Sequence, residues 1–330
     1  MFFVHRGHKR AKVSVLTPVF NVARYLPRCL ESLRRQRLSD IEFICVNDGS
    51  TDESLQILKS YASQDDRFRI IDQKNAGYGA AMNRALDASC GQYIGIVESD
   101  DFVSGDMFKC LFRLASRKRL DIVKTNYFEH RGGTEDVFSE PFVDFEYGKV
   151  FDPWDVPEII KVIPNIWAAL YSRQMLEDNG IRFNETPGAS FQDTSFAHRC
   201  WISSHRAMLL HDAFVHYRLD REESSVKSNS KVFAVCDEYA TTESFLAERE
   251  DRLRRFGPML NAAKFNTYRW NYNRITSDYH AVFCKRWAAE YRSALADGLL
   301  DKDLLTPVEW AQALELMDDP VSFALQNETI

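Results

Sequence analysis

The chain has 330 residues, of which 45% are hydrophobic and 27% are charged, and its formal net charge is −6 at pH 7. This composition is typical of a globular protein and excludes disordered and collagen-like chains. The small net charge provides no overall attraction to nucleic acid or to an anionic membrane, so we expect no nucleic-acid partner.

The cysteines and the hydropathy pattern indicate the cellular compartment in which the protein is expected. All seven cysteines stand far apart, with no CxxC pair and no zinc-type Cys/His spacing. This predicts reduced thiols and a cytoplasmic location. No apolar run reaches the ~20 residues that span a bilayer. The opening segment "MFFVHRGHKR" has too short an apolar stretch for a signal peptide.

Strands and helices alternate through the first 100 residues. The runs "KVSVLTPVF" and "IEFICVND" predict strands, and each is followed by a segment with helical spacing. In the second of these segments, Ser50 or Thr51 is expected to cap the helix. The pattern continues with "FRIIDQ" as a strand, "YGAAMNRALDAS" as a helix and "QYIGIVES" as a strand. This alternation predicts a mainly parallel sheet with right-handed crossovers.

The pattern changes near residue 121. "DIVKTNYFEH" predicts another strand, "IWAALYSRQMLEDNG" has helical spacing with Gly180 as its stop, and "RAMLLHDAFVHYRL" predicts one or two strands. The polar segment "REESSVKSNSK" predicts a loop, and the chain beyond it is mostly helical to about Leu316. We therefore expect one α/β domain over residues 12–220 and a helical extension over residues 221–330.

Three carboxylates crowd the end of the strand in "GIVESDD", residues 95–101. Because ligands of parallel sheets bind beyond the carboxyl ends of the strands, this cluster and Asp48 should share one edge. Neighbouring carboxylates repel one another unless a cation neutralises them, and Mg²⁺ or Mn²⁺ prefers such oxygen ligands together with substrate phosphates. The alternative is that Asp100 and Asp101 only cap the helix that begins near Gly105.

The segment "NAGYGAAMN" invites a dinucleotide-binding interpretation because it contains Gly77 and Gly79 ahead of a helix. Its spacing is GxGxxM instead of GxGxxG, and it follows the third strand instead of the first. A Rossmann-type oxidoreductase would need a proper glycine fingerprint combined with an acidic residue about 20 positions later, and the chain lacks that combination. A Rossmann-type oxidoreductase is therefore disfavoured.

The N-terminal two thirds of the chain resembles the family-two glycosyltransferases of the GT-A fold, of the bacterial cell-surface polysaccharide type. The matching segments are "VSVLTPVFNVARYLPRCLESLRRQ", "IEFICVNDGSTDES", "NAGYGAAMNRAL", "GQYIGIVESDD" and "IRFNETPGASFQDTSF", within residues 12–219. Such enzymes transfer a sugar from a nucleoside diphosphate to an acceptor hydroxyl. The resemblance divides the α/β domain into a nucleotide-sugar-binding half, residues 12–125, and an acceptor half, residues 126–220.

The resemblance also implies a donor site and a metal. Asp48 would accept a hydrogen bond from the base, which is a charge-assisted contact. "ESD" occupies the place of the metal-binding Asp-any-Asp motif, with Asp100 as the ligand of Mn²⁺ or Mg²⁺ and His216 as a second metal candidate. Asp101 is expected to be only a cap. The implied nucleotide-sugar-binding residues are Thr17, Pro18, Phe20, Asp48, Gly77, Asn83, Glu98, Ser99, Asp100 and Arg218.

The catalytic base implied by the resemblance is Asp193 in "SFQDTSF", where Gln192 replaces the usual Glu. A carboxylate near the acceptor hydroxyl suits this role. The alternative for Asp193 is an N-cap of a helix that starts near Ser195.

The expected activity is metal-dependent, inverting transfer from a UDP-linked sugar donor to a glycan or lipid-linked acceptor, in polysaccharide or glycolipid assembly. Glu98, Met82 and Gln192 depart from the family pattern, so a catalytically degenerate nucleotide-sugar-binding or assembly protein is the alternative. The aromatic and basic segments "KFNTYRWNYNRI" and "FCKRWAAEYR" leave three roles open: packing, a homodimer contact, or peripheral contact with the inner face of a membrane.

Overall fold

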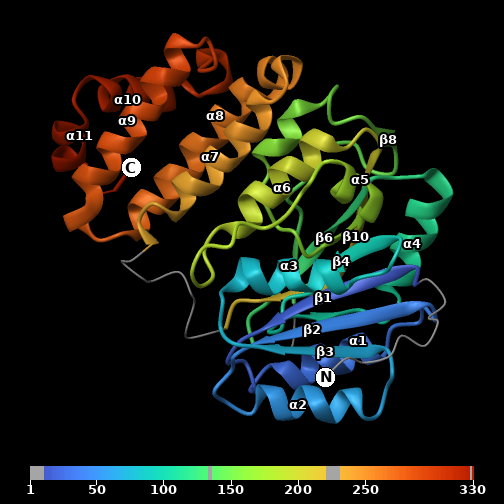
Figure 1. Ribbon diagram of the computed structural model, residues 1–330. Coiled ribbons are helices and arrows are strands. Elements are labelled where there is room, and N and C mark those ends of the chain that lie inside the picture. Colours follow the sequence, from blue (N-terminus) through green and yellow to red (C-terminus); the bar gives the residue numbers. More distant parts are fainter. Residues whose placement is uncertain (1–10, 133–135, 221–230, 328) are drawn as a thin grey trace. The chain divides into compact units, whose positions relative to one another are not determined.

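The computed structural model describes residues 11–132, 136–220, 231–327 and 329–330 (Figure 1). The opening segment and the polar loop predicted from Arg221 fall largely outside this range. The chain forms two compact units. The sheet unit comprises the described residues within Met1–Pro153, Asn165–Ala189 and Ser203–Glu222, and the helical unit those within Trp154–Pro164, Ser190–Ile202 and Glu223–Ile330.

A ten-stranded sheet forms the centre of the sheet unit. Its first half consists of parallel strands in the order β3-β2-β1-β4, and its second half continues as β9-β6-β10-β5 with mixed directions. Strands β7 and β8 pair with β6 and β10, respectively. The bounds are β1 (Val13–Val19), β2 (Ile41–Asp48), β3 (Phe68–Gln73), β4 (Tyr93–Ile96), β5 (Phe102–Val103), β6 (Ile122–His130), β7 (Val137–Ser139), β8 (Val150–Phe151), β9 (Ala169–Ser172) and β10 (Ala207–Arg218).

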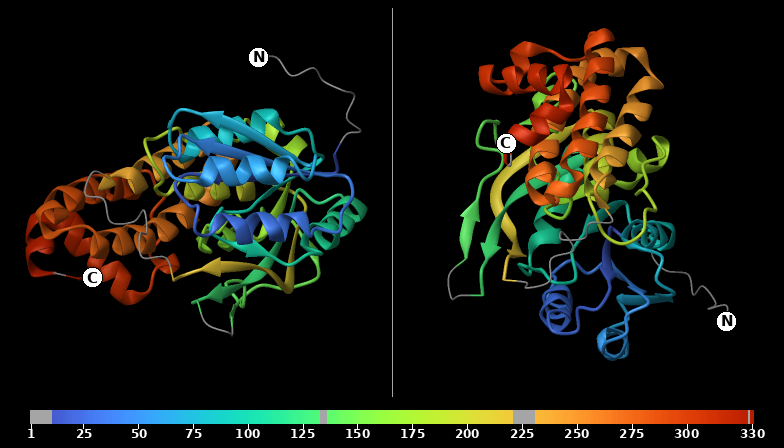
Figure 2. Two further views of the ribbon diagram at one scale, coloured as in Figure 1. Left: turned by 90° about the horizontal axis from the view of Figure 1, so that it is seen from below. Right: turned by 90° about the vertical axis from the view of Figure 1, so that its left-hand side faces the viewer.

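The strand order reverses between β1 and β4. The chain moves from β1 to β2 to β3 in one direction and then returns to the other side of β1. Right-handed crossovers therefore place α1 (Leu26–Arg34) and α2 (Ser54–Ala62) on one face and α3 (Tyr78–Ala88) on the other, as Figures 1 and 2 show. All residues of β1 and β2 are buried, which explains their continuous apolar runs.

The predicted helix over residues 166–180 is partly wrong. Residues Ala169–Ser172 form β9, and only Arg173–Asp178 form a helix, α5. β9 is a short strand between β4 and β6 in the sheet, and its apolar residues are buried on both sides. Sheet pairing therefore outweighs the helical spacing. The remaining helix of this unit is α4 (Met107–Lys118).

The helical unit contains α6 and the C-terminal helices. Its aromatic residues are packed inside: Phe265, Tyr268, Trp287 and Tyr291 are fully buried and lie in ring contact with one another. Much of the aromatic content of the two quoted C-terminal segments is therefore core. The bounds are α6 (Gln192–Ser203), α7 (Ala234–Ala247), α8 (Glu250–Arg274), α9 (His280–Ala296), α10 (Pro307–Asp318) and α11 (Pro320–Gln326), with 3₁₀ turns at Pro157–Lys161, Ser277–Tyr279 and Lys302–Leu304.

Two segments belong to a different unit from the one that the domain prediction gave them. Residues 154–164 and 190–202 were expected in the α/β domain, and they cluster instead with the C-terminal helices. Ile159 and Ile160 are buried in the 3₁₀ turn that packs against α8. Phe196 and Cys200 on α6 are also fully buried. A single boundary at residue 220 cannot reproduce this grouping, because both segments lie before that boundary in sequence and yet cluster with the C-terminal helices.

All seven cysteines lie in described parts of the chain and carry free thiols. Within the described ranges, no helix combines the length and apolar character that crossing a bilayer requires.

Candidate active site

The carboxyl ends of β1 and β4 flank the reversal point of the sheet, where an α/β sheet offers its ligand crevice. Thr17 and Pro18 are buried at the end of β1, and Phe20 just beyond it is 46% exposed. The Thr17 hydroxyl has no hydrogen-bond partner within the described residues. The Val97 N–H donates to the Leu16 carbonyl (3.0 Å), which places the start of the acidic turn directly beside β1.

Asp48 is buried at the end of β2 and organises the turn that follows β3. Its two carboxylate oxygens accept from the backbone N–H groups of Ala76 and Gly77, both at 2.9 Å, and from Gln73 Nε2 at 2.8 Å. The interpretation of Asp48 as a turn residue therefore has direct geometric support. Its predicted contact with a base would use the remaining lone pairs of the same oxygens.

The glycines of "NAGYGAAMN" allow close packing of a loop. A Cβ on Gly77, whose φ is +94°, would lie 2.8 Å from the Thr186 carbonyl oxygen, and a Cβ on Gly79 would overlap the carbonyl of Asn184. Asn83 strengthens the same contact, because its side chain donates to and accepts from the backbone of Phe183 at 2.9 Å. These residues thus dock residues 183–188 onto the start of α3.

The acidic turn after β4 holds its three carboxylates in different environments. Glu98 is partly exposed and accepts a hydrogen bond from the Tyr78 hydroxyl (2.7 Å), while Ser99 is buried. Asp100 is partly exposed. Tyr78 was not among the predicted site residues. The only feature of the sequence that pointed to it was its position at the start of the helix predicted from "YGAAMNRALDAS".

Asp101 does not cap α4, which corrects that prediction. The helix starts later, with Asp106 at its N-cap position. Asp101 is 1% exposed, and its Oδ1 accepts from the Arg218 backbone N–H at 2.8 Å. Burial, followed by the charge of neighbouring Asp100, raises the pKa of Asp101 well above its usual range. The pairing of β5 with β10 creates this arrangement, because it brings residues 216–218 beside residues 100–102.

Arg218 brings a positive charge to the acidic turn. Its Nε donates to the Asp100 carbonyl (2.9 Å), its Nη1 pairs with Asp220 (3.0 Å), and its guanidinium lies 4.8 Å from the centre of the Tyr25 ring. The sequence interpretation placed Arg218 near the phosphates of a donor. Its position on the acidic turn suits that role, since guanidinium forks match phosphate oxygens.

The residues of the acidic turn fit a divalent cation of the magnesium type. Within the described residues there is no group of three or more His, Cys, Asp or Glu side chains arranged to hold a metal ion. Mg²⁺ commonly takes only one or two carboxylates and completes its shell with water and substrate phosphates. Two partly exposed carboxylates on one turn, Glu98 and Asp100, meet this requirement.

His216 has partners other than the acidic turn. Its Nδ1 hydrogen-bonds to Asp136, whose other oxygen contacts His130 Nδ1 at 2.6 Å, and its ring stacks on Phe102 with centroids 4.4 Å apart. Burial disfavours the charged form of Asp136 and so tends to raise its pKa. The hydrogen bonds from His130 and His216 outweigh burial and hold the pKa below the ordinary value. Two histidines that share a carboxylate were not predicted, since the three residues are far apart in sequence.

Asp193 lies in the first turn of α6, in the helical unit. Its side chain keeps some accessible surface, yet burial raises its pKa to about 6, against the effect of hydrogen bonds from backbone N–H groups and the Thr194 hydroxyl. A carboxylate with a pKa near 6 is better matched to proton transfer near neutral pH than an ordinary aspartate.

The turn before Asp193 explains the departure from the usual Glu-Asp pair. The Gln192 side-chain oxygen accepts a hydrogen bond from the Ser190 backbone N–H, and the Thr194 N–H donates to the Phe191 carbonyl at 2.9 Å. An amide oxygen accepts this bond as a carboxylate oxygen would, so Gln192 supports the turn without a charge.

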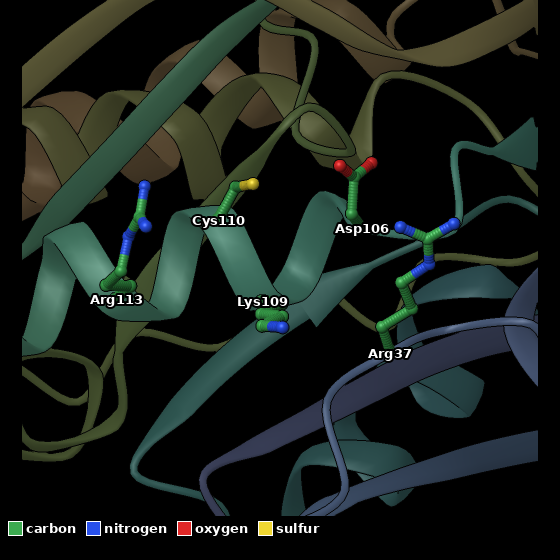
Figure 3. Close-up of a pocket in the computed structure, with 5 residues that line it drawn as sticks. All are labelled: Arg37, Asp106, Lys109, Cys110 and Arg113. Carbon is green, nitrogen blue, oxygen red and sulfur yellow. The ribbon is translucent and has the colours of Figure 1, made fainter.

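Two surface hollows lie on the sheet unit, and none of the predicted site residues lines either one. The first is lined by Arg37, Asp106, Lys109, Cys110 and Arg113 (Figure 3). The second, with a volume of about 630 Å³, lies between α1 and β5 and shares Arg37 with the first. Both are open, strongly charged depressions, and neither resembles the apolar pocket typical of a small-molecule site.

The fold and the acidic turn define an α/β protein whose ligand crevice lies at the reversal point of a mostly parallel sheet, and comparisons with known proteins show its family. The family model for glycosyl transferase family 2 matches residues 14–180. Two curated relatives from Bacillus subtilis are the uncharacterized glycosyltransferase EpsJ and the putative glycosyltransferase EpsH. EpsJ is 34% identical over 62% of this chain and 60% of its own length, and EpsH is 31% identical over 72% and 69%. The matched part therefore spans about three fifths of EpsJ.

A solved structure of similar fold is S. aureus TarS 1–349 in complex with UDP-GlcNAc. It has a TM-score of 0.75 at 20% sequence identity and covers 96% of this chain and 91% of its own. The chain thus belongs to glycosyl transferase family 2 and has the GT-A fold, with a mostly parallel central sheet and a C-terminal helical region.

Proposed function

We propose that this protein is a metal-dependent, inverting glycosyltransferase that moves a sugar from a UDP-linked donor to a hydroxyl of a glycan or lipid-linked acceptor in cell-surface polysaccharide or glycolipid assembly. The observation that carries the proposal is the acidic turn at the reversal point of the sheet. There Glu98 and Asp100 lie partly exposed beside the cation Arg218. A combination of carboxylates and a guanidinium suits a diphosphate together with a divalent cation.

The donor would occupy the edge formed by β1, β2 and β4. The unpartnered Thr17 hydroxyl and the Asp48 oxygens offer hydrogen bonds to a nucleoside, and exposed Phe20 offers a ring for stacking. Uridine is the proposed base, since TarS, which shares the fold, was solved with UDP-GlcNAc. Gly77, whose N–H is bound to Asp48, and the buried Ser99 would support the same edge, whereas Asn83 is engaged in packing and would contribute indirectly.

Asp100, with Glu98, would hold Mn²⁺ or Mg²⁺. A bound divalent cation would supply countercharge for the departing diphosphate. Arg218 adds a fixed positive charge beside the same turn, which the sheet holds in place before any donor arrives. His216 remains a predicted second ligand, and its stacking on Phe102 and its bond to Asp136 give that assignment less support.

Asp193 would act as the general base. Its carboxylate would accept the proton of the attacking acceptor hydroxyl while that oxygen forms the new bond to the anomeric carbon and the bond to the diphosphate breaks. Attack from the face opposite the leaving group inverts the anomeric centre. The raised pKa of about 6 supports this role because it makes proton acceptance in the transition state more favourable.

The experiment that tests the proposal compares Asp193→Asn with the wild type. Purified protein is incubated with Mn²⁺ and UDP-GlcNAc, UDP-glucose or UDP-galactose, and UDP affinity and sugar release to water or to added acceptors are measured. We expect the variant to bind UDP with an affinity within about twofold of the wild type and to lose at least ~100-fold in turnover. Equal turnover would refute the base assignment.

The alternative, a degenerate nucleotide-sugar-binding or assembly protein, makes a different prediction in the same assay. Wild-type protein would bind UDP but release no sugar from any donor. Three departures from the family pattern, at Glu98, Met82 and Gln192, motivated this alternative. Met82 is a fully buried core residue, Gln192 keeps its acceptor function in the turn, and Glu98 still supplies a partly exposed carboxylate. We therefore favour catalysis over the alternative.

A further inference from the structure

Phe191, two residues before Asp193, has an uncommon backbone conformation. Its φ is +61°, in the left-handed region that bulky residues rarely occupy. Such a conformation persists only where surrounding contacts hold it, and it is often found beside functional residues.

The turn itself supplies only part of the support for Phe191. The hydrogen bonds from Ser190 to Gln192 and from Thr194 to the Phe191 carbonyl close the backbone on either side of Asp193. Both bonds are local, and they leave the Phe191 side chain to be held by something else.

Two side chains of α8 hold the Phe191 ring. The Trp270 ring contacts it edge to face, with centroids 5.6 Å apart and an interplanar angle of 84°. The Arg274 guanidinium lies 5.1 Å from the centre of the Phe191 ring and 5.2 Å from that of Trp270. Because Trp270 and Arg274 are four residues apart on one helix, they present a single face. Phe191, Trp270 and Arg274 form what we call the aromatic clamp.

The clamp is anchored to the core of the helical unit. Arg274 Nη2 donates to Asn271 Oδ1 at 2.8 Å, and the fully buried Asn271 in turn donates to the Val232 carbonyl at 3.1 Å. Burial lowers the pKa of Arg274 and of Lys231, and the charge of Arg274 lowers that of Lys231 further.

Trp270 contributes little to a hydrophobic core, since it is 51% exposed. A single exposed aromatic side chain is ordinary in itself. What distinguishes Trp270 is its edge-to-face contact with the Phe191 ring, which supports the segment that carries Asp193.

We infer that Trp270 and Arg274 are positioning residues, which hold Phe191 in its left-handed turn and thereby set the orientation and surroundings of the Asp193 carboxylate. The inference rests on the proposed function, because it assigns to α8 the support of the proposed base. It makes the C-terminal helices part of the catalytic apparatus even though they lie outside the residues that the family model matches.

The first test uses turnover with water as the acceptor, so that no acceptor needs to be known. Trp270→Ala, Arg274→Ala and Phe191→Ala are compared with wild type in Mn²⁺-dependent sugar release from whichever of UDP-GlcNAc, UDP-glucose and UDP-galactose the wild type hydrolyses. We expect each to lose about ten- to a hundredfold in rate, the size of effect that a small misplacement of a catalytic group produces. UDP affinity should stay within about twofold.

The pattern among variants separates positioning from a general loss of structure. Phe191→Asn should retain more activity than Phe191→Ala, because Asn tolerates positive φ. The double variant Trp270→Ala with Phe191→Ala should be no slower than Phe191→Ala alone, since both remove the same contact. The matched control is Arg254→Ala, an exposed arginine of α8 paired only with Glu250 among the described side chains, and it should match the wild type.

Two further readouts do not depend on the absolute size of the turnover rate. The acidic midpoint of the pH–rate profile should move below about 6 in Trp270→Ala, because a freed Asp193 becomes better solvated and its pKa falls. Without any ligand, amide hydrogen exchange over residues 190–195 should accelerate in the same variant.

Several outcomes would overturn the inference. The inference fails if Trp270→Ala hydrolyses the donor at the wild-type rate, or if the rate losses of the two single variants multiply in the double variant. It also fails if amide hydrogen exchange over residues 190–195 is unchanged in Trp270→Ala. Loss of transfer to an added acceptor with unchanged hydrolysis would also refute it, because Trp270 would then contact the acceptor. If the wild type binds UDP but hydrolyses no donor, the proposed function fails and the inference fails with it.

Discussion

Asp193 shows how burial can set the chemistry of a single residue. A carboxylate in the first turn of a helix is normally stabilised in its charged form by the helix dipole and by backbone N–H groups. Here desolvation outweighs those effects and raises the pKa to about 6. Because α6 begins at Gln192, Asp193 lies inside its first turn and not at the N-cap position of a helix that starts near Ser195. The raised pKa supports the proposed role as a base.

This shift predicts the pH dependence of turnover. Asp193 must be deprotonated to accept a proton, so the rate should fall tenfold per pH unit below about 6 and level off above it. The measurement is kcat/KM for donor hydrolysis between pH 4.5 and 8.5. A flat profile down to pH 4.5 would contradict the assignment, while Asp193→Glu should keep an acidic limb with a displaced midpoint.

At the scale of elements, the start of α3 shows why small residues occur there. Gly79 allows the Asn184 carbonyl to approach the helix, and Asn83 bonds the same loop through the backbone of Phe183. The glycines that suggest a dinucleotide fingerprint are therefore explained by packing within the sheet unit.

Gly79→Ala should destabilise the protein by about 3 kcal/mol, because the new methyl group would overlap a backbone atom that cannot move freely. The matched control is Gly257→Ala in α8, where the nearest atom is the end of the Leu299 side chain at 3.0 Å. That end can shift, and alanine favours helix, so the control should be near neutral. Urea unfolding measures both, and equal effects would contradict the explanation.

Helices α7, α8 and α9 are joined by a buried charge. Lys264 on α8 has a side chain only 1% exposed, and its ammonium pairs with Glu243 of α7 and with Glu290 of α9, the latter at 3.1 Å. Tyr268 donates to the same Glu290 at 2.7 Å. Lys264 belongs to the segment "KFNTYRWNYNRI", whose role the sequence left open, and it links helices within the helical unit.

Lys264→Ala should cost about 3 kcal/mol of unfolding free energy, because it leaves two carboxylates facing a buried site without their cation. Arg254→Ala, which breaks an exposed pair on the same helix, should cost less than ~0.5 kcal/mol. Denaturant titrations at neutral pH compare the two. A small effect of Lys264→Ala would mean that water or Arg286 compensates.

At the scale of the whole molecule, the proposed donor site predicts a metal-dependent gain in stability. A ligand at a hundred times its Kd stabilises by about 2.7 kcal/mol. UDP with Mn²⁺ should therefore raise the thermal midpoint by a few degrees, and UDP with a chelator should raise it less.

The metal-dependent part of this shift should disappear in Asp100→Asn and persist in the control Asp106→Asn, which changes an aspartate outside the acidic turn. Differential scanning fluorimetry provides the measurement. If UDP raises the thermal midpoint equally with chelator and with Mn²⁺, the proposed metal site is wrong, while the proposed nucleotide site stands.

The sequence by itself determined the parallel half of the sheet, the acidic turn and the family, because strand periodicity, turn residues and short motifs are local properties. Tertiary structure decided what those residues contact. Strand β9 formed against helical spacing, since insertion between β4 and β6 buries both of its faces. Asp101 became a buried partner of Arg218 because β5 pairs with β10. Phe191 is held by α8 across almost 80 positions of sequence, and only packing in three dimensions creates such a contact.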